Sequence, residues 1–307
     1  MSQTVTTPRE RPPAEPPSEP EVTEAAPEEA PTPSRRWRQV ALWSAVVLIV
    51  LFCLFPFYWL INTSLKTGAE LSRANLVPPS PTLENYSSIF KNADFTMAIR
   101  NSAIIAGTVT VLSLVIGSFA GYALARLRFP RKFLILAVIL SISTFPPIAI
   151  AAPVFQLWND IGLFNTYIGL ILPSLTFGLP LTIYILASFF RDIPTELEEA
   201  ALIDGATRFQ AFRKVIVPLS APGMVTAGLL VFIFAWNEFL FAITLTSTPE
   251  RRPVPAAIAF FTGSQEFEVP LGTISAASVV VTVPLVVLVL LFQRRIVSGL
   301  TAGAVKG

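Results

Sequence analysis

The chain of 307 residues is 53% apolar and only 14% charged, with a formal net charge of +2. Because soluble domains carry about 25% charged residues, this composition excludes an ordinary soluble domain and indicates a protein solvated mostly by lipid. The small net charge gives no indication of a nucleic-acid partner. The sequence has no histidine and one cysteine, Cys53, which excludes histidine-dependent nucleophiles, thiolate or histidine metal sites and a disulfide framework. We therefore expect no catalytic residues and no metal on this chain.

The first 34 residues differ in composition from the rest. They hold nine of the 27 prolines, seven glutamates and few apolar residues, so they cannot bury enough surface to offset the entropy of ordering. We predict a disordered cytoplasmic tail over 1–34 and a membrane domain over 35–307. A signal peptide is not expected, because the chain starts acidic and proline-rich and its first apolar run is too long for a signal-peptide core.

Apolar runs long enough to cross a bilayer recur along the chain. A spanning helix needs roughly 20 apolar residues, and six stretches meet this length. They cover about 40–61, 98–124, 133–158, 167–190, 223–245 and 272–292. The sequence therefore predicts an all-α integral membrane protein with six transmembrane helices.

Prolines interrupt the third and fourth of these runs: Pro146, Pro147, Pro153, Pro173 and Pro180. Proline is tolerated inside a membrane helix when neighbouring groups satisfy the carbonyl it frees. Two interpretations stay open at this point, packing kinks, which we favour, and hinges of a gate.

The distribution of lysine and arginine predicts the orientation. With the amino terminus inside, the inner segments carry 14 cationic residues and the outer segments carry six. Since short cytoplasmic loops are enriched in Lys and Arg, we expect both termini in the cytoplasm and the segment 62–97 outside, in a multi-pass protein of the cell membrane.

The inner segment 191–222 carries the most local structural information. Thr195 with Glu198, and Thr207 with Gln210, have the spacing of capping boxes, in which a hydroxyl and a carboxylate or amide satisfy the free N–H groups of a helix start. The first box predicts a helix over 196–204, ended by Gly205 in the left-handed conformation. The second predicts a helix with an apolar face of Phe209, Phe212 and Ile216, stopped by Pro218. Such a structured loop either docks on another protein or lies on the membrane surface as an amphipathic connector.

Three motifs resemble those of known membrane proteins. Glu199-Ala200-Ala201, three residues, Gly205, nine residues and Val215-x-Val217-Pro218 resemble the EAA loop of ABC importer permeases, with valine where that pattern favours Ile and Leu. The tail 293–307 resembles the carboxy-terminal signature of the maltose-type, carbohydrate-uptake permeases. The run 234–239, Phe-Ala-Trp-Asn-Glu-Phe, is a third resemblance, and the whole is most similar to the mycobacterial-type trehalose-importing subunits. The tail 1–34 departs from that pattern.

The resemblance implies the type I importer permease fold, with a coupling helix between spans four and five, and a division of labour. An ATPase dimer would bind ATP and Mg, a second homologous permease would complete the pore, and an extracytoplasmic solute-binding (lipo)protein would deliver a carbohydrate. This chain has no G-x-x-x-x-G-K-[ST] loop, and we expect no cofactor on it. The residues that the resemblance assigns to ATPase coupling are Glu199, Ala200, Ala201, Asp204, Gly205, Phe212 and Pro218. Those assigned to a contact of the tail are Gly299, Gly303 and Lys306.

The fifth run contains Trp236, Asn237 and Glu238, which the sequence offers as candidate residues of the substrate pathway. A charge inside a membrane helix costs roughly 2.5–3.5 kcal/mol, so Glu238 is expected to face protein or water. Asn and Glu can bond sugar hydroxyls and Trp can stack on a sugar face. The alternative is that these side chains only hold the bundle together. A membrane enzyme or a channel scaffold remains a less favoured alternative for the whole chain.

Overall fold

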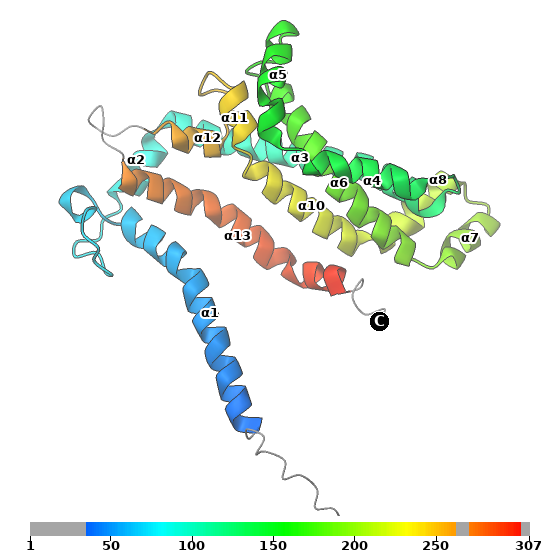
Figure 1. Ribbon diagram of the computed structural model, residues 1–307, viewed down its shortest axis with the longest axis horizontal. Coiled ribbons are helices and arrows are strands. Elements are labelled where there is room, and N and C mark those ends of the chain that lie inside the picture. The colour runs from blue at the N-terminus through cyan, green and yellow to red at the C-terminus, as the bar shows by residue number, and fades with distance from the viewer. Residues whose placement is uncertain (1–34, 262–269, 302–307) are drawn as a thin grey trace, which may run out of the picture. The chain divides into compact units, whose positions relative to one another are not determined.

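The structure is a computed structural model that describes residues 35–261 and 270–301. The tail predicted over 1–34 lies outside these residues. Within the described ranges all regular structure is helical (Figure 1). The chain divides into two compact units, one ending at Cys53 and one beginning at Leu54.

The elements have the following bounds along the chain. In order they are α1 Arg35–Ser64, the 3-10 turn Gly68–Glu70, α2 Glu84–Lys91, α3 Ala93–Arg126, α4 Lys132–Thr144, α5 Pro147–Asp160, α6 Tyr167–Asp192, α7 Thr195–Ile203, α8 Arg208–Ala211, a π-helical stretch Phe212–Ile216, α9 Val217–Leu219, α10 Ala221–Trp236, α11 Leu240–Leu245, α12 Val254–Ala259 and α13 Leu271–Thr301. This order confirms the all-α prediction for the described residues.

Four unbroken helices are long and apolar enough to cross a membrane: α1, α3, α6 and α13. A count of six is reached when each of two bent helix pairs is taken as one span. One pair is α4 with α5, bent by 84°, and the other joins Arg208–Leu219 to α10 at 75°. The chain is therefore a multi-pass membrane protein. The third expected run is bent between α4 and α5, and the fifth expected run is divided between α10 and α11.

Proline chemistry explains the break in the third expected span. Pro146 and Pro147 both lack an N–H, and Pro147 opens α5 at a position where the first helical N–H groups have no partner anyway. Pro153, Pro173 and Pro180 by contrast lie inside α5 and α6 without ending them. The double proline thus bends the chain, whereas the single prolines are accommodated.

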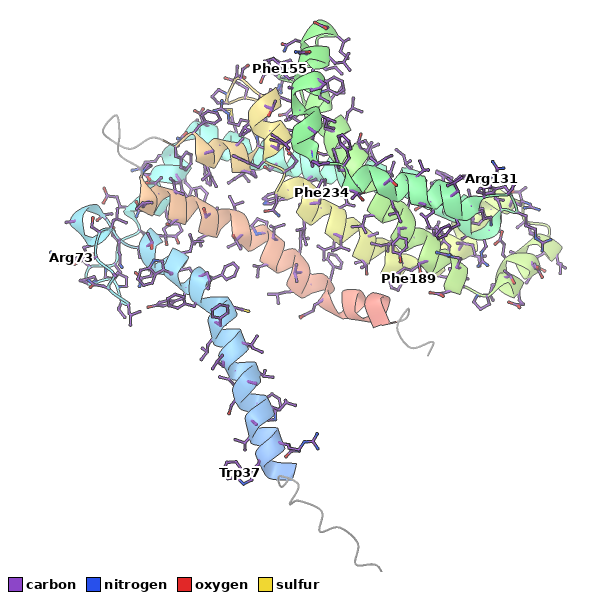
Figure 2. All side chains as sticks on the ribbon, viewed as in Figure 1. Trp37, Arg73, Arg131, Phe155, Phe189 and Phe234 are labelled. Carbon is purple, nitrogen blue, oxygen red and sulfur yellow. The ribbon has the colours of Figure 1, made fainter. Side chains whose placement is uncertain are left out.

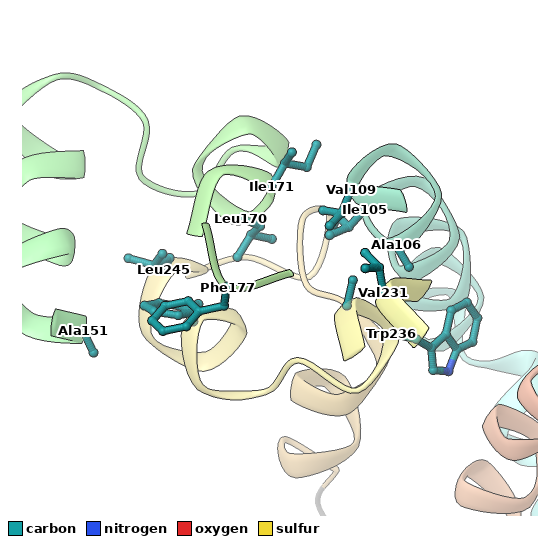
Figure 3. Close-up of a cluster of buried hydrophobic side chains, with 12 residues drawn as sticks. Ile105, Ala106, Val109, Ala151, Leu170, Ile171, Phe177, Val231, Trp236 and Leu245 are labelled. Carbon is teal, nitrogen blue, oxygen red and sulfur yellow. The ribbon is translucent and has the colours of Figure 1, made fainter. Parts of the chain in front are cut away.

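The core of the second unit is built around α3, which packs against α6 and α10. A Cβ on Gly117 would lie only 2.7 Å from Cγ2 of Thr182, and one on Gly121 only 3.0 Å from the backbone nitrogen of Ala187. Glycine at these two positions therefore lets α3 and α6 approach closely, as small residues do in membrane helix pairs. Figure 3 shows a buried apolar cluster to which α3, α5, α6, α10 and α11 contribute.

Large apolar side chains cover much of the outside of the long helices (Figure 2). Phe133 on α4 is 85% exposed, and Leu291 on α13 is 70% exposed. In water such a surface would favour aggregation, whereas lipid solvates it without cost. The exposed side chains therefore agree with a membrane environment.

Candidate coupling loop

The first helix of the loop 191–222 begins without the expected capping box. Pro194 occupies the N-cap of α7 and no side chain bonds to the free N–H groups there, so the box predicted from Thr195 and Glu198 is wrong. α7 consequently starts one residue earlier than predicted. The carboxylate of Glu198 has a different partner, because it points toward α3.

Glu198 is held by the last turns of α3. Its carboxylate accepts a hydrogen bond from the hydroxyl of Tyr122 and forms an ion pair with Arg126, with 3.4 Å between Oε2 and Nε. The two charged side chains are only 11% and 8% exposed. Arg126 also donates from Nη2 to the carbonyl of Ile193, 2.6 Å away. A buried guanidinium that loses its carboxylate destabilises the folded protein. This explains why Glu198 pairs with Arg126 of α3 and does not cap the start of α7.

The end of α7 has the predicted geometry. Gly205 has a φ of +86°, and its N–H bonds to Leu202 while that of Ala206 bonds to Ala201. These two bonds form a Schellman motif, which satisfies carbonyls that a helix end leaves free. A Cβ on Gly205 would meet no atom within 4 Å, so the requirement for glycine comes from the backbone conformation alone.

The second helical segment begins with the predicted capping box and ends later than predicted. Thr207 Oγ1 accepts from the N–H of Gln210 at 3.2 Å, and Gln210 Oε1 accepts from the N–H of Thr207 at 2.8 Å. The segment then continues through the π-helical stretch to Leu219. Pro218 therefore does not stop the helix at once, since it lies in the first turn of α9, where its missing N–H is tolerated. The chain bends only at Ser220.

An aromatic cluster attaches this second segment to the membrane helices. Phe212 is 6% exposed, and its ring centroid lies 4.8 Å from that of Tyr122, 5.4 Å from Phe119 and 6.2 Å from Phe190. Ile216 is fully buried beside it. Phe209, expected on the same apolar face, is instead 58% exposed. The loop is therefore packed on α3 and α6 through one part of its apolar surface and leaves another part uncovered.

The residues that the resemblance assigned to coupling fall into two groups in space. Phe212 is buried, whereas Glu199, Ala200, Asp204, Gly205 and Pro218 are exposed and Ala201 is half-buried. The uncovered surface also includes apolar side chains, with Leu197 at 44% and Ile203 at 85% exposure. Of the exposed group, Glu199, Ala200, Asp204 and Gly205 lie together on α7 and its C-terminal turn, whereas Pro218 lies on α9.

The candidate pathway residues lie at a break in the fifth expected span, with Trp236 as the last residue of α10 and Asn237 and Glu238 between α10 and α11. α10 ends at Trp236, and Glu238 accepts from the N–H groups of Phe241 and Ala242, at 2.8 and 3.0 Å, and so caps α11. Asn237 is exposed and donates to the carbonyl of Ile233 at 2.8 Å. Trp236 is 3% exposed and stacks on Phe232, and within the described chain its Nε1 has no hydrogen-bond partner. Figure 3 shows its ring at the edge of the buried cluster.

The carboxy-terminal segment is partly outside the described residues. α13 continues to Thr301 and includes Gly299, so the tail predicted from residue 293 is helical in its first part. Gly303 and Lys306 lie outside the described residues.

The sequence did not single out Tyr122, Arg126 or Phe119. Each is an ordinary residue of an expected span end, where an aromatic or a cation is common. The available signal for the ion pair was the cation Arg126 at the end of one span and the acidic residue Glu198 in the loop two spans later. The sequence alone does not show that these two residues meet.

Comparison with known proteins identifies the family. Residues 92–301 match the family described as "Binding-protein-dependent transport system inner membrane component". The chain belongs to this family. The resemblance carried by the loop and tail motifs is thereby confirmed.

Several curated relatives align over nearly their full length. The chain is 51% identical over 271 residues to the trehalose transport system permease protein SugB of Mycobacterium tuberculosis, covering 88% of this chain and 99% of that protein. It is 44% identical to the sulfoquinovosyl glycerol transport system permease protein SmoH of Agrobacterium fabrum, covering 86% and 92%. It is 42% identical to the trehalose/maltose transport system permease protein MalG of Thermococcus litoralis, covering 88% and 98%.

A solved structure shows the same fold. A bacterial ABC transporter involved in the import of the acidic polysaccharide alginate aligns with a TM-score of 0.70 at 24% identity, covering 86% of this chain and 99% of the matched chain. The architecture of this chain is therefore that of an ABC transporter permease.

Proposed function

We propose that this chain is the permease subunit of an ATP-driven importer for a carbohydrate, a disaccharide such as trehalose. The observation that carries the proposal is the 51% identity to a trehalose permease over almost the whole of both chains. The similarity to a trehalose/maltose permease supports the same class of substrate. Glycosides of other kinds are the second candidate, favoured by the similarity to a sulfoquinovosyl glycerol permease.

Uptake measurements separate these candidates. Radiolabelled trehalose, maltose and a glycerol glycoside are supplied to a strain lacking the gene, with and without a plasmid copy. Saturable trehalose uptake that returns with the gene is the expected result. Uptake of the glycoside alone would favour the second candidate, and a gene that restores uptake of none of the three sugars would contradict both candidates.

The exposed surface of the loop supports an ATPase dimer as one proposed partner. An ATPase dimer, carrying ATP and Mg, would dock on α7 and its C-terminal turn, where Leu197 and Ile203 are exposed beside Glu199. Burial of such apolar side chains drives association. Movement of that dimer would then shift the loop and, through Phe212 and Glu198, the helices α3 and α6. A second permease and an external solute-binding protein complete the proposed assembly.

Loss of docking should follow from Gly205→Asp. The substitution opposes the positive φ at this turn and adds a charge to the exposed surface, while nothing near it is crowded. We expect normal insertion in the membrane, with loss of ATPase association and of trehalose-stimulated ATP hydrolysis. Normal assembly and uptake in this variant would contradict docking at this loop.

The carboxy-terminal tail is proposed as a second contact with the ATPase subunits. Full transport by a chain truncated after Arg295 would contradict this contact.

We propose the orientation with both termini and the coupling loop in the cytoplasm, and the segment 62–97 outside. The positive-inside rule supports it. A reporter that is active only in the cytoplasm should be silent at Thr82 and active at the carboxy terminus. Cytoplasmic activity at Thr82 would contradict the orientation.

The substrate pathway is proposed to pass the break between α10 and α11. Asn237 is exposed there and its side-chain oxygen is available to a sugar hydroxyl. If Glu238 contacts sugar, Glu238→Gln should change the apparent affinity of uptake at normal protein abundance. If it only caps α11, Glu238→Leu should lower the amount of assembled complex and Glu238→Gln should leave the affinity unchanged. Unchanged kinetics in both Glu238→Gln and Asn237→Ala would exclude this pathway.

A further inference from the structure

Helix α3 is fastened by buried polar groups at both of its ends. At the carboxyl end, Tyr122 and Arg126 hold Glu198 of α7. At the amino end, Asn101 and Ser102 hold the segment 246–254, which connects α11 to α12 and includes the first residue of α12. These contacts join elements far apart in the sequence, and neither belongs to the regular packing of the helix bundle.

The contacts at the amino end are short, and the two side chains of α3 that make them are buried. Asn101 is 0% exposed and donates from Nδ2 to the carbonyls of Glu250 and Arg252, each at 3.0 Å. Ser102 Oγ accepts from the N–H of Val254 at 2.8 Å. The hydroxyl of Tyr167 donates to Asn101 Oδ1 at 2.7 Å and so fixes the orientation of the amide.

A second amide fastens the other part of the same segment. Asn165, which has a positive φ of 57°, accepts from the N–H of Ser247 at 3.1 Å and donates to Thr248 Oγ1 at 3.1 Å. The guanidinium of Arg251 lies over the ring of Tyr167, 4.6 Å from its centroid. The backbone of 246–254 is thereby held in one conformation against α3 and the start of α6.

Between its ends α3 is one unbroken helix of 34 residues. At 1.5 Å per residue, the distance from Asn101 to Tyr122 is roughly 30 Å. The close approach at Gly117 and Gly121 interlocks the middle of α3 with α6. A displacement of the carboxyl end must therefore be carried along the helix or absorbed by breaking buried contacts, because packed interiors deform little.

We propose that α3 links the coupling loop to the segment 246–254, with Arg126 as the positioning residue at one end and Asn101 at the other. The inference rests on the proposed function, since ATPase subunits must act on the coupling loop. Nucleotide-driven movement of α7 would displace α3 through Glu198 and Arg126. The side-chain amide of Asn101 would transmit the displacement of α3 to the segment 246–254. Coupling of this kind needs a contiguous element that both sites bias.

Hydrogen exchange on the assembled complex tests the linkage without any sugar. The full chain is purified with its ATPase subunits and second permease, and exchange is followed in 195–205 and 246–254 with and without ATP plus vanadate. In the wild type, the exchange rate of both segments should change when ATP plus vanadate is added; this change is the response of each segment. In Arg126→Met the response of 195–205 should remain, whereas that of 246–254 should fall roughly two- to thirtyfold, the range found for mutations along coupled networks.

Matched controls make the result specific. Arg128→Met removes an exposed cation two residues away and should leave both responses unchanged. Tyr122→Phe removes only a hydroxyl and replaces Arg126→Met if that variant does not assemble. At the other end, Asn101→Ala should abolish the response of 246–254 alone, and exposed Asn159→Ala should not.

The outcomes separate this inference from the proposed function. Absence of any response at 195–205 in the wild type contradicts the proposed coupling to an ATPase. A response at 195–205 without one at 246–254 overturns the linkage. An unchanged response of 246–254 in Arg126→Met, or loss of both responses together, also overturns it.

Discussion

The two helical parts of the loop 191–222 are attached to the membrane helices by different chemistry. α7 is joined through one charged side chain, Glu198, to Tyr122 and Arg126. The segment from Arg208 to Leu219 is joined through buried Phe212 in an aromatic cluster. An ion pair is directional and fails when either partner is lost, whereas an apolar contact tolerates sliding but depends on volume. One attachment therefore sets where α7 points, and the other keeps the loop on the bundle.

Removal of the aromatic attachment should have the largest effect. Phe212→Ala leaves a cavity among the rings of Phe119, Tyr122 and Phe190, at a cost of about 3–5 kcal/mol for a buried phenylalanine. We expect a large fall in the denaturation midpoint of the purified protein in detergent. Phe209→Ala is the matched control, because that ring is exposed. An equal fall in the denaturation midpoint of both variants would contradict the difference between the buried and exposed parts of this face.

Disruption of the ion pair should have an intermediate effect. Glu198→Leu leaves the buried guanidinium of Arg126 without its carboxylate, and breaking a buried pair in this way costs about 3–5 kcal/mol, of which the remaining bond to Ile193 recovers part. Glu198→Gln keeps an acceptor and should lose less. In a double-mutant cycle, Glu198→Leu combined with Arg126→Met should be less destabilised than the sum of the single variants. Strict additivity would show that the two side chains do not interact.

A backbone change at the end of α7 should cost less. Gly205→Ala adds a methyl group that meets no neighbour, so only the positive φ opposes it, at roughly 1–2 kcal/mol. Ala206→Gly is the control: it makes the backbone next to Gly205 more flexible without adding a side chain at the positive φ. Limited proteolysis of the loop should accelerate in Gly205→Ala at unchanged abundance. Unaltered cleavage would indicate that this turn does not require glycine.

The smallest predicted effect compares two threonines with the same sequence signature. Thr207→Ala removes a hydroxyl that caps α8, which costs about 1 kcal/mol. Thr195→Ala removes one that caps nothing and should be nearly neutral. The denaturation midpoints of the two variants measure this directly. Equal destabilisation by both would contradict the observed difference in capping.

Much of this protein could be predicted from its sequence, since length, hydropathy and the turn residues act locally. The apolar runs predicted membrane helices because their burial in lipid does not depend on a partner. Gly205 and the box at Thr207 predicted a turn and a helix start because both concern a few neighbouring backbone groups. The EAA-type spacing and the tail predicted the family that the comparison showed.

The tertiary structure decided the features that depend on which elements meet. Thr195 and Glu198 have the spacing of a capping box, yet the buried cation of Arg126 takes the carboxylate, because an unpaired buried charge costs more than an uncapped helix end. The fifth apolar run breaks at Asn237, and Glu238 caps the helix that follows. Asn101 donates hydrogen bonds to the carbonyls of Glu250 and Arg252, 149 and 151 residues away. These bonds form only when the chain folds, since no local pattern encodes contacts at such separation.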